Sequence, residues 1–142
     1  MKKIILVTIL MLSYSGLIHS QDGSEGAKIK FDTKVYNYGT IYQKGDGNCQ
    51  FKFTNTGDQP LSLTAVRSSC GCTVPKWPRK PIMPGDTAKI KVTYDTRRLG
   101  PINKQITVRS NAKNGTMILR IKGKVIRPTQ EAPKKVKSDM DK

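Results

Sequence analysis

Histidine is almost absent from this sequence, because its 142 residues include only one, His19. Ser-His-Asp and Cys-His nucleophilic sites, and zinc or copper sites with histidine ligands, all require an imidazole side chain. His19 falls in an N-terminal segment that we expect to be removed, as argued below. We therefore predict that the chain is not an enzyme of these classes and that it holds no cofactor and no metal.

Helical periodicity is also missing after residue 20, where no useful length of sequence repeats apolar residues with a period near 3.6. The same part of the chain has no run approaching the ~20 apolar residues that a membrane-spanning helix needs. These two absences predict an all-β protein that does not span a membrane once its N-terminal segment is cleaved.

The first twenty residues have the pattern of a signal peptide. Lys2 and Lys3 form a positive start, residues 4–12 are almost continuously apolar, and Ser20 supplies a small residue at the expected cut. The first cysteine is Cys49, so no cysteine is available for lipid attachment near the cut. We expect cleavage after residue 20, loss of His19 with the leader, and a location in the periplasm, at the cell surface or outside the cell.

Acidic residues are few. The whole chain has 26 Lys and Arg against 10 Asp and Glu, and removal of residues 1–20 leaves 24 against 10, a net charge of +14. An exported basic protein meets anionic polysaccharides, lipid headgroups or acidic proteins before intracellular nucleic acid. The alternative is that the lysines only keep the outer faces of a β-sandwich solvated.

Between the ends of the chain, apolar residues alternate with polar ones. Cys49, Phe51 and Phe53 are expected on the inner face of one strand, and 87–96 has the same pattern. Turn residues separate the strands, for example at Asn114-Gly115. Strands are predicted at 48–54, 61–66, 87–96, 102–110 and 117–125, with 29–31 and 35–41 as one broken edge strand.

About seven short strands at regular spacing are typical of a β-sandwich or barrel. We expect one such domain over residues 28–127. Residues 21–27 are predicted to be a flexible lead-in, and 128–142 a disordered basic tail, because both are polar and without periodicity.

Four segments together resemble the bacterial domain of unknown function (DUF) family 1573. They are Phe53-Thr54-Asn55-Thr56-Gly57 with Pro60-Leu61, Ser69-Cys70-Gly71-Cys72-Thr73, Pro84-Gly85, and Ile90-Lys91-Val92-Thr93-Tyr94. The resemblance covers roughly Phe31 to Val125. It implies an exported immunoglobulin-like β-sandwich of seven strands, related in shape to Hydin and major sperm protein domains, and it supplies no established activity. Cys49 is outside the family pattern.

Cys70-Gly71-Cys72-Thr73 is the most distinctive of these segments and the main candidate site. Its two cysteines fit a structural disulfide, a redox-active dithiol, or a two-thiolate site for a soft metal such as Cu(I). Disulfides are the ordinary state of cysteines in an oxidising compartment, which favours the structural interpretation.

The pairing of the three cysteines depends on the chain path. If strand 48–54 turns and returns along 61–66, Cys49 approaches Cys70, and a bridge from Cys49 to Cys70 or Cys72 would close a loop of about 20 residues. Such a bridge would stabilise the fold by roughly 3 kcal/mol. A direct bond between Cys70 and Cys72 would instead close a small strained ring that is easily reduced.

The last two strands supply a second candidate site. Arg109, Arg120, Lys122 and Lys124 all fall on the outward phase of the final hairpin, without an acidic residue among them. They are expected to lie close together and to hold an anionic polymer. The sequence thus predicts a non-enzymatic binding or scaffold module that contacts an envelope protein or an anionic polymer, with a thiol-disulfide or copper-handling protein as the alternative.

Overall fold

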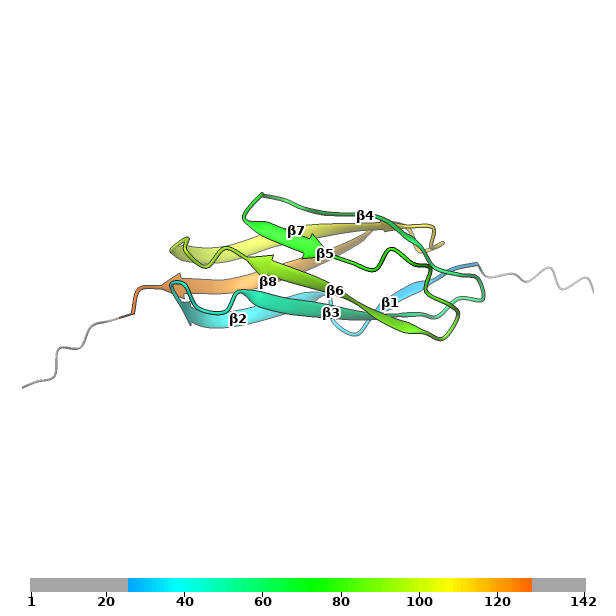
Figure 1. Cartoon of the computed structure of the whole chain (residues 1–142), viewed down its shortest axis with the longest axis horizontal. Coiled ribbons are helices and arrows are strands. Elements are labelled where there is room, and N and C mark those ends of the chain that lie inside the picture. The colour runs from blue at the N-terminus through cyan, green and yellow to red at the C-terminus, as the bar shows by residue number, and fades with distance from the viewer. Residues whose placement is uncertain (1–25, 129–142) are drawn as a thin grey trace, which may run out of the picture.

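The structure is a computed structural model that describes residues 26–128, and in this range it contains eight strands and no helix. The strands run along the long axis of the domain in two layers (Figure 1). They are β1 (Ile29–Phe31), β2 (Val35–Tyr42), β3 (Asn48–Asn55), β4 (Leu63–Ser68), β5 (Thr73–Lys76), β6 (Thr87–Tyr94), β7 (Gly100–Ser110) and β8 (Met117–Ile126).

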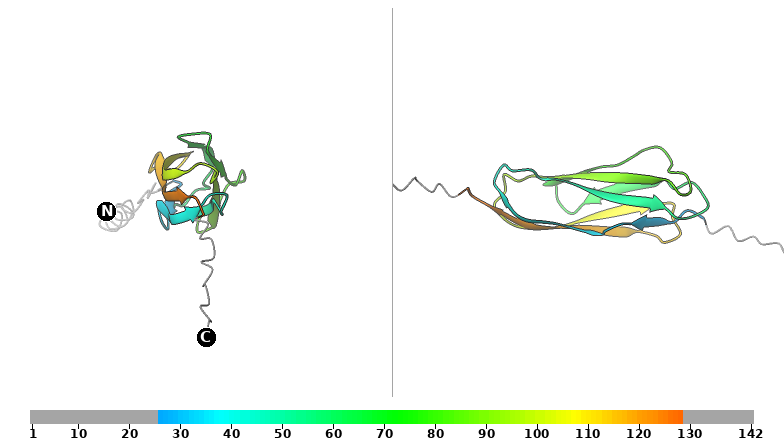
Figure 2. Two further views of the ribbon diagram at one scale, coloured as in Figure 1. Left: turned by 90° about the vertical axis from the view of Figure 1, so that its left-hand side faces the viewer. Right: turned by 90° about the horizontal axis from the view of Figure 1, so that it is seen from below.

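Each layer is a four-stranded sheet, and the two face each other as a sandwich (Figure 2). Sheet A has the order β1-β3-β6-β5, and sheet B has the order β2-β8-β7-β4. All neighbouring strands are antiparallel except β2 and β8, which are parallel. The prediction of an all-β, immunoglobulin-like sandwich is confirmed.

Two strand predictions need correction. Residues 29–31 and 35–41 were expected to form one broken edge strand, but β1 belongs to sheet A and β2 to sheet B, so the chain changes sheet at Asp32 to Lys34. β5 was not predicted, because four residues containing Pro75 are too short to show a period of two. With β1 and β2 counted separately and β5 added, the domain has eight strands, where about seven were expected.

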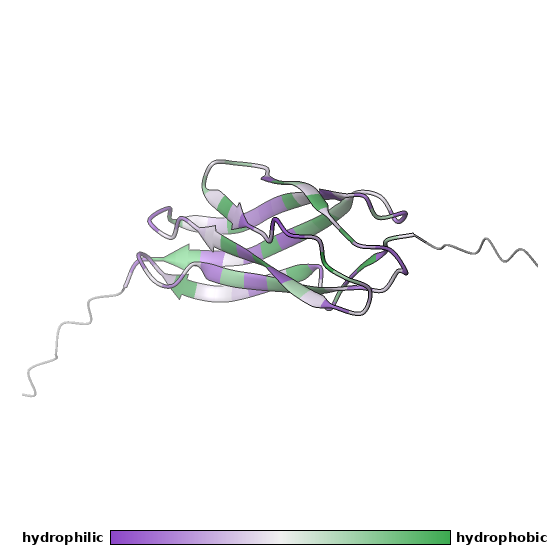
Figure 3. Cartoon of the chain, turned by 45° about the vertical axis from the view of Figure 1, so that its right-hand side comes forward, coloured by the Kyte–Doolittle hydropathy of each residue, from purple (hydrophilic) through white to green (hydrophobic). Residues whose placement is uncertain are grey.

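The core lies between the sheets and consists mainly of the buried apolar residues of the strands. Along the strands, hydrophobic and hydrophilic residues alternate (Figure 3). In β3 the residues that alternate as buried are Cys49, Phe51, Phe53 and Asn55. Burying a large apolar side chain contributes about 1.5–3 kcal/mol. The largest fully buried apolar side chains are Phe51, Phe53, Ile29, Leu61, Ile90, Ile106, Leu119, Ile121, Val92, Val108 and Val125.

Asn55 fixes the corner at which the chain leaves sheet A. Its side-chain amide donates to the carbonyl oxygens of Gln59 at 2.8 Å and Ile82 at 2.9 Å, and its Oδ1 accepts from the backbone N–H of Gly57 at 3.0 Å. A Cβ at Gly57 would collide with the backbone of Gly26, so this tight corner requires glycine. The chain then crosses to β4 in sheet B.

The four edge strands are all poor templates for a further strand. β1 has three residues, β5 has four and contains Pro75, and the pairing of β4 shifts between Leu63 and Ala65. β2 has a similar shift between Asn37 and Thr40, where Gly39 has a φ of +63°. Short strands, prolines and bulges are the usual means of preventing edge-to-edge pairing.

The folded part begins slightly before the predicted boundary at residue 28. Ala27, assigned to the lead-in from the sequence, is buried, and its carbonyl accepts a hydrogen bond of 2.9 Å from Lys113 N. The predicted leader 1–20, most of the lead-in and nearly all of the tail 128–142 lie outside the described residues. Within the described range, no helix is long and apolar enough to cross a membrane.

Candidate functional site

The Cys70-Gly71-Cys72 turn connects β4 of sheet B with β5 of sheet A. The Ser68 hydroxyl holds its two ends together, because Oγ lies 2.6 Å from the carbonyl oxygens of both Cys70 and Thr73. The backbone N–H of Ser69 also donates to Gln105 O on β7 at 2.9 Å. The turn is therefore tied to both sheets at one end of the sandwich.

A disulfide joins Cys70 to Cys72. Cys72 is only 6% exposed, whereas Cys70 is half-buried. The buried Thr73 hydroxyl lies 3.8 Å from each of the two sulfur atoms and can donate a hydrogen bond to either one. The four residues singled out from the sequence thus form one local unit.

The predicted bridge from Cys49 to Cys70 or Cys72 does not form, because β3 and β4 are not a hairpin. Cys49 lies on β3, and β6 separates β3 from β5, which follows Cys72 directly. Two strand spacings amount to about 9.6 Å, which exceeds the usual Cα separation of about 4.4–6.8 Å in a disulfide. Cys49 is instead a buried free thiol.

Tyr38 on β2 lies beside this thiol. Burial raises the pKa of Cys49, while a hydrogen bond with Tyr38 acts in the opposite direction. The Tyr38 hydroxyl donates to Gly47 O at 2.7 Å, and its pKa is raised strongly, mainly by burial. Both groups stay protonated at neutral pH, so Cys49 has the environment of an inert core thiol.

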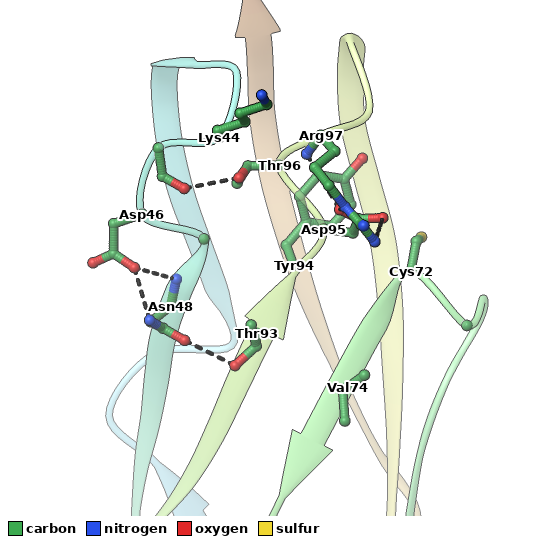
Figure 4. A pocket seen from close by; sticks show the side chains of 13 residues that line it. Lys44, Asp46, Asn48, Cys72, Val74, Thr93, Tyr94, Asp95, Thr96 and Arg97 are labelled. Atoms are coloured by element: carbon green, nitrogen blue, oxygen red, sulfur yellow. Dashed lines mark hydrogen bonds and ion pairs between the residues drawn. The ribbon is translucent and has the colours of Figure 1, made fainter.

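A groove of about 710 Å³ opens beside the disulfide (Figure 4). Residues 44–48 form one wall, Gly71, Cys72 and Val74 form the other, and the end of β6 with residues 95–97 lies between them. Asp95 accepts hydrogen bonds from Arg97 Nε at 2.8 Å and from Arg97 Nη2 at 3.2 Å. These bonds hold the pKa of Asp95 below its usual value.

Metal ligands are not gathered in this groove. Within residues 26–128, no group of three or more His, Cys, Asp or Glu side chains is arranged to hold a metal ion. Asp95 is engaged by Arg97, and Asp46 accepts hydrogen bonds from Asn48 N at 2.9 Å and Asn48 Nδ2 at 2.8 Å. The two carboxylates therefore already have local structural partners.

The predicted basic face is only partly assembled on sheet B. Arg120, Lys122 and Lys124 are exposed on β8 at alternate positions, so they share the outer face of the sheet. Their neighbours on β7 are Gln105, Asn103 and Pro101, and on β2 they are Val35, Asn37 and Thr40. All six neighbours are uncharged, so these three cations form a row without a carboxylate beside them.

Arg109 does not join this row, contrary to the sequence prediction. It pairs with Ala65 on β4, four residues along β7 from the level of Arg120. Four residues of strand span about 13 Å. Arg109 instead lines a small pocket of about 160 Å³ with Arg67 and Thr107. The sequence prediction missed Arg67 as a member of this face, although Arg67 directly follows the predicted strand 61–66.

The outer face of sheet A carries a second set of cations that the sequence prediction did not select. Lys52 on β3 lies directly opposite Lys89 on β6, and Lys91 on β6 lies directly opposite Lys76 on β5. All four side chains are exposed. The alternating lysines in 87–96 could have indicated that this face is basic. Which lysines lie opposite each other could not be predicted without the register between the strands.

Carboxylates are confined to the turns. The described acidic residues are Asp32, Asp46, Asp58, Asp86 and Asp95, and each lies outside the strands. Within residues 26–128, only Lys52 of these four lysines forms an ion pair with a carboxylate, and its Nζ lies 3.8 Å from Asp32 Oδ2. Both outer faces of the described sandwich are therefore basic along their strands.

A model of the family "Protein of unknown function (DUF1573)" matches residues 29–125. The chain belongs to the DUF1573 family. This confirms the resemblance carried by the Asn55 corner and the Cys70-Gly71-Cys72 turn. Among curated proteins, no sequence matches this chain.

Solved structures resemble this DUF1573 domain in fold. A protein of unknown function from Porphyromonas gingivalis W83 has a TM-score of 0.63 and 14% identity, over 78% of this chain and 50% of that one. The chain thus spans half the length of that protein. The ASH / PapD-like domain 7 of human CEP192 has a TM-score of 0.62 and 12% identity, over 81% and 96%.

A third similar structure is WR4, a member of the major sperm protein family of C. elegans. Its TM-score is 0.51 at 14% identity, over 70% of this chain and 99% of that one. At these identities the likeness concerns the fold alone. It agrees with the immunoglobulin-like sandwich, and the function has to be argued from the surface of this chain.

Proposed function

We propose that this DUF1573 protein is a non-enzymatic, exported module that binds an anionic polymer of the bacterial envelope through the outer face of sheet B. The single observation that carries the proposal is the row of Arg120, Lys122 and Lys124 on β8, whose six strand neighbours are all uncharged. The pattern of a leader in residues 1–20 supports export.

The edges of the sheets favour binding through a face. Every edge strand is short, shifted in register or interrupted by a proline, so addition of a partner strand has little backbone to pair with. The broad faces have no such obstacle. They present regularly spaced cations that a chain with regularly spaced anions can follow.

The strength of such binding comes from the number of cations. A single exposed ion pair contributes about 0–1 kcal/mol, but a polyanion also releases its condensed counterions when several cations contact it together. Alternate positions on a strand are about 6.6 Å apart. Three cations in one row therefore span about 13 Å and can contact successive charged units of one polymer.

The test compares polymers that differ in charge. Polygalacturonate and dextran sulfate are titrated with the purified protein at low salt, and uncharged dextran serves as the control polymer. The variant Arg120→Gln/Lys122→Gln/Lys124→Gln removes the row. The control, called the loop variant, removes the same charge away from the row with Lys44→Gln and Lys80→Gln in loops and Lys30→Gln on β1 of sheet A.

The proposal expects binding of both polyanions, no binding of dextran, and a loss of about 100-fold in affinity for the β8 variant. The loop variant should lose less than fivefold. Equal losses in the two variants would show that net charge alone is responsible. Equal binding of dextran and dextran sulfate would remove the electrostatic basis of the proposal.

Thiol-disulfide exchange through Cys70 and Cys72 is the second candidate, and the disulfide between them favours it. A thiolate of a partner dithiol would attack the more exposed Cys70 sulfur, and the electron pair of the broken bond would leave on Cys72. The Thr73 hydroxyl, 3.8 Å away, can donate to that thiolate. Attack by the partner's second thiolate would release a reduced chain and an oxidised partner.

Two measurements separate this candidate from a structural disulfide. A reduction potential above about −230 mV would agree with exchange, and one below about −300 mV would agree with a structural role. Titration of the reduced protein with Cu(I), with Cys70→Ser/Cys72→Ser as the control, tests copper handling. Copper binding that persists in this variant would contradict a role for the two thiols.

A further inference from the structure

A second groove, of about 510 Å³, is lined mainly by residues of sheet A, among them Lys76 of β5, Lys91 of β6 and Gln50 of β3, with Tyr36 of β2 as its one member from sheet B. Lys91 is the direct cross-strand neighbour of both Gln50 and Lys76. Asn48 and Thr93 form the next row of the same face. The groove therefore crosses three strands.

Two lysines of this groove, Lys76 and Lys91, are direct cross-strand neighbours. Because Lys76 and Lys91 occupy opposite positions on neighbouring strands, their side chains start about 4.5–5.5 Å apart. No ion pair joins either lysine to a carboxylate within residues 26–128. Like charges in this position destabilise a sheet, and an anion placed between them would relieve the repulsion.

The next row of the groove is held in a fixed geometry. The Thr93 hydroxyl donates to Asn48 Oδ1 at 2.8 Å, and Asn48 Nδ2 donates to Asp46 at 2.8 Å (Figure 4). Thr93 Oγ1 still has a lone pair that can accept a hydrogen bond, and Asn48 Nδ2 has a second hydrogen to donate. The neighbouring Gln50 contributes a further amide.

We propose that this groove binds one acidic sugar unit, with its carboxylate or sulfate between Lys76 and Lys91 and its hydroxyl groups against Gln50, Asn48 and Thr93. The proposal rests on the proposed function, because it names an acidic polysaccharide as the polymer. The groove has a volume of about 510 Å³, which falls within the range of about 300–1,000 Å³ for small-molecule sites. Lysine serves here as a point charge, without the planar geometry that arginine would impose.

The groove and the β8 row lie on opposite faces of the domain. Sheet A and sheet B are the two layers of one sandwich, so their outer faces point in opposite directions (Figure 2). A polysaccharide strand on the β8 row and a second strand at the Lys76–Lys91 groove would be held by the same domain. The protein would then cross-link acidic polysaccharide.

The experiment uses three variants that each lose two positive charges. Lys76→Gln/Lys91→Gln changes the groove, Arg120→Gln/Lys124→Gln changes the β8 row, and Lys44→Gln/Lys80→Gln is the control. Trigalacturonate binding is measured by calorimetry, and cross-linking of long polygalacturonate is measured by light scattering. A thermal unfolding scan of each variant confirms that it is folded.

The groove variant should lose at least tenfold in trigalacturonate affinity and should no longer raise scattering, while its binding of the long polymer persists through β8. The β8 variant should also fail to cross-link, but its trigalacturonate affinity should stay within twofold of the wild type. The control should match the wild type in both measurements.

The possible failures are distinct. Wild-type trigalacturonate affinity in the groove variant overturns the groove and leaves the proposed function standing. Wild-type binding of the long polymer by the β8 variant overturns the β8 site, while a loss in the groove variant still supports the groove. A wild-type protein that binds neither probe overturns both proposals, and an equal loss in the control overturns any specific site.

Discussion

The inner and outer surfaces of the same strands differ sharply in composition in this domain. The inner phase of β3 and β6 is almost entirely apolar, with Asn55 as its main polar member, whereas the outer phase of these strands carries lysines without an acidic residue. The inner surface buries the large apolar side chains that stabilise the fold. The outer surface places Lys52 opposite Lys89 and Lys76 opposite Lys91, which stability alone does not favour.

We infer from this contrast that the inner groups determine the stability of the domain and that the outer cations determine its binding. Removal of an inner group should cost stability and should affect binding only through unfolding. Removal of an outer cation should reduce binding and leave stability equal or higher, as is common where function and stability conflict. The following changes test this separation.

The largest effect is expected inside, at Asn55. In Asn55→Ala, the Gly57 N–H loses its acceptor, and the carbonyl oxygens of Gln59 and Ile82 lose their donor. These backbone groups are then unpaired in or near the core. We expect a loss of about 3 kcal/mol or more in the free energy of unfolding, measured by urea denaturation.

Asn111→Ala is the matched control for Asn55. Asn111 also joins two backbone groups, Ser62 N at 2.9 Å and Pro60 O at 3.0 Å, but these contacts are exposed to water. Its loss should cost only about 1 kcal/mol. Similar costs for the two variants would contradict the idea that burial of the corner fixes the chain crossing.

An intermediate effect is expected for the disulfide. A bond between Cys70 and Cys72 closes a loop of three residues, for which chain entropy gives about 1.6 kcal/mol, about half the value for a loop of 20 residues. Reduced and oxidised protein are compared by urea denaturation. A difference above about 3 kcal/mol would indicate that a longer loop is closed, as a Cys49 bridge would do.

The smallest effect has the opposite sign and concerns the outer surface. Lys89→Gln removes the repulsion with Lys52, so the protein should gain about 0.2–1 kcal/mol in stability. Lys30→Gln, whose cross-strand partner is Thr54, is the control and should leave stability unchanged. A loss of stability in Lys89→Gln would show that the lysines are not under repulsion.

Much of the fold could be predicted from the sequence, because an alternating strand shows its two faces directly. The strands 48–54 and 87–96 were correctly predicted for this reason, and Cys49 was correctly placed inside. The alternation of residues does not show to which of the two sheets a strand belongs. The turn residues Asn55 to Pro60 are the same whether a chain returns beside its own strand or crosses to the opposite sheet.

This limitation explains the errors at both candidate sites. The assumed hairpin of β3 and β4 brought Cys49 to the Cys70-Gly71-Cys72 turn, whereas the crossing places β6 between them. Arg109 was grouped with Arg120 because both point outward on one hairpin, but the register places them four residues apart. The periodicity of a strand predicts which side chains point outward. The distance between two cations on neighbouring strands, however, depends on the register between those strands.

The most direct test of the central claim is the salt dependence of polygalacturonate affinity, measured for the wild type and for Arg120→Gln/Lys122→Gln/Lys124→Gln. In the wild type, log K for polygalacturonate should fall linearly as the logarithm of the salt concentration rises. In the variant the slope should be shallower by about 2, because each of three contacts contributes about 0.7–0.9. Identical slopes in the two proteins would contradict a polymer site on β8.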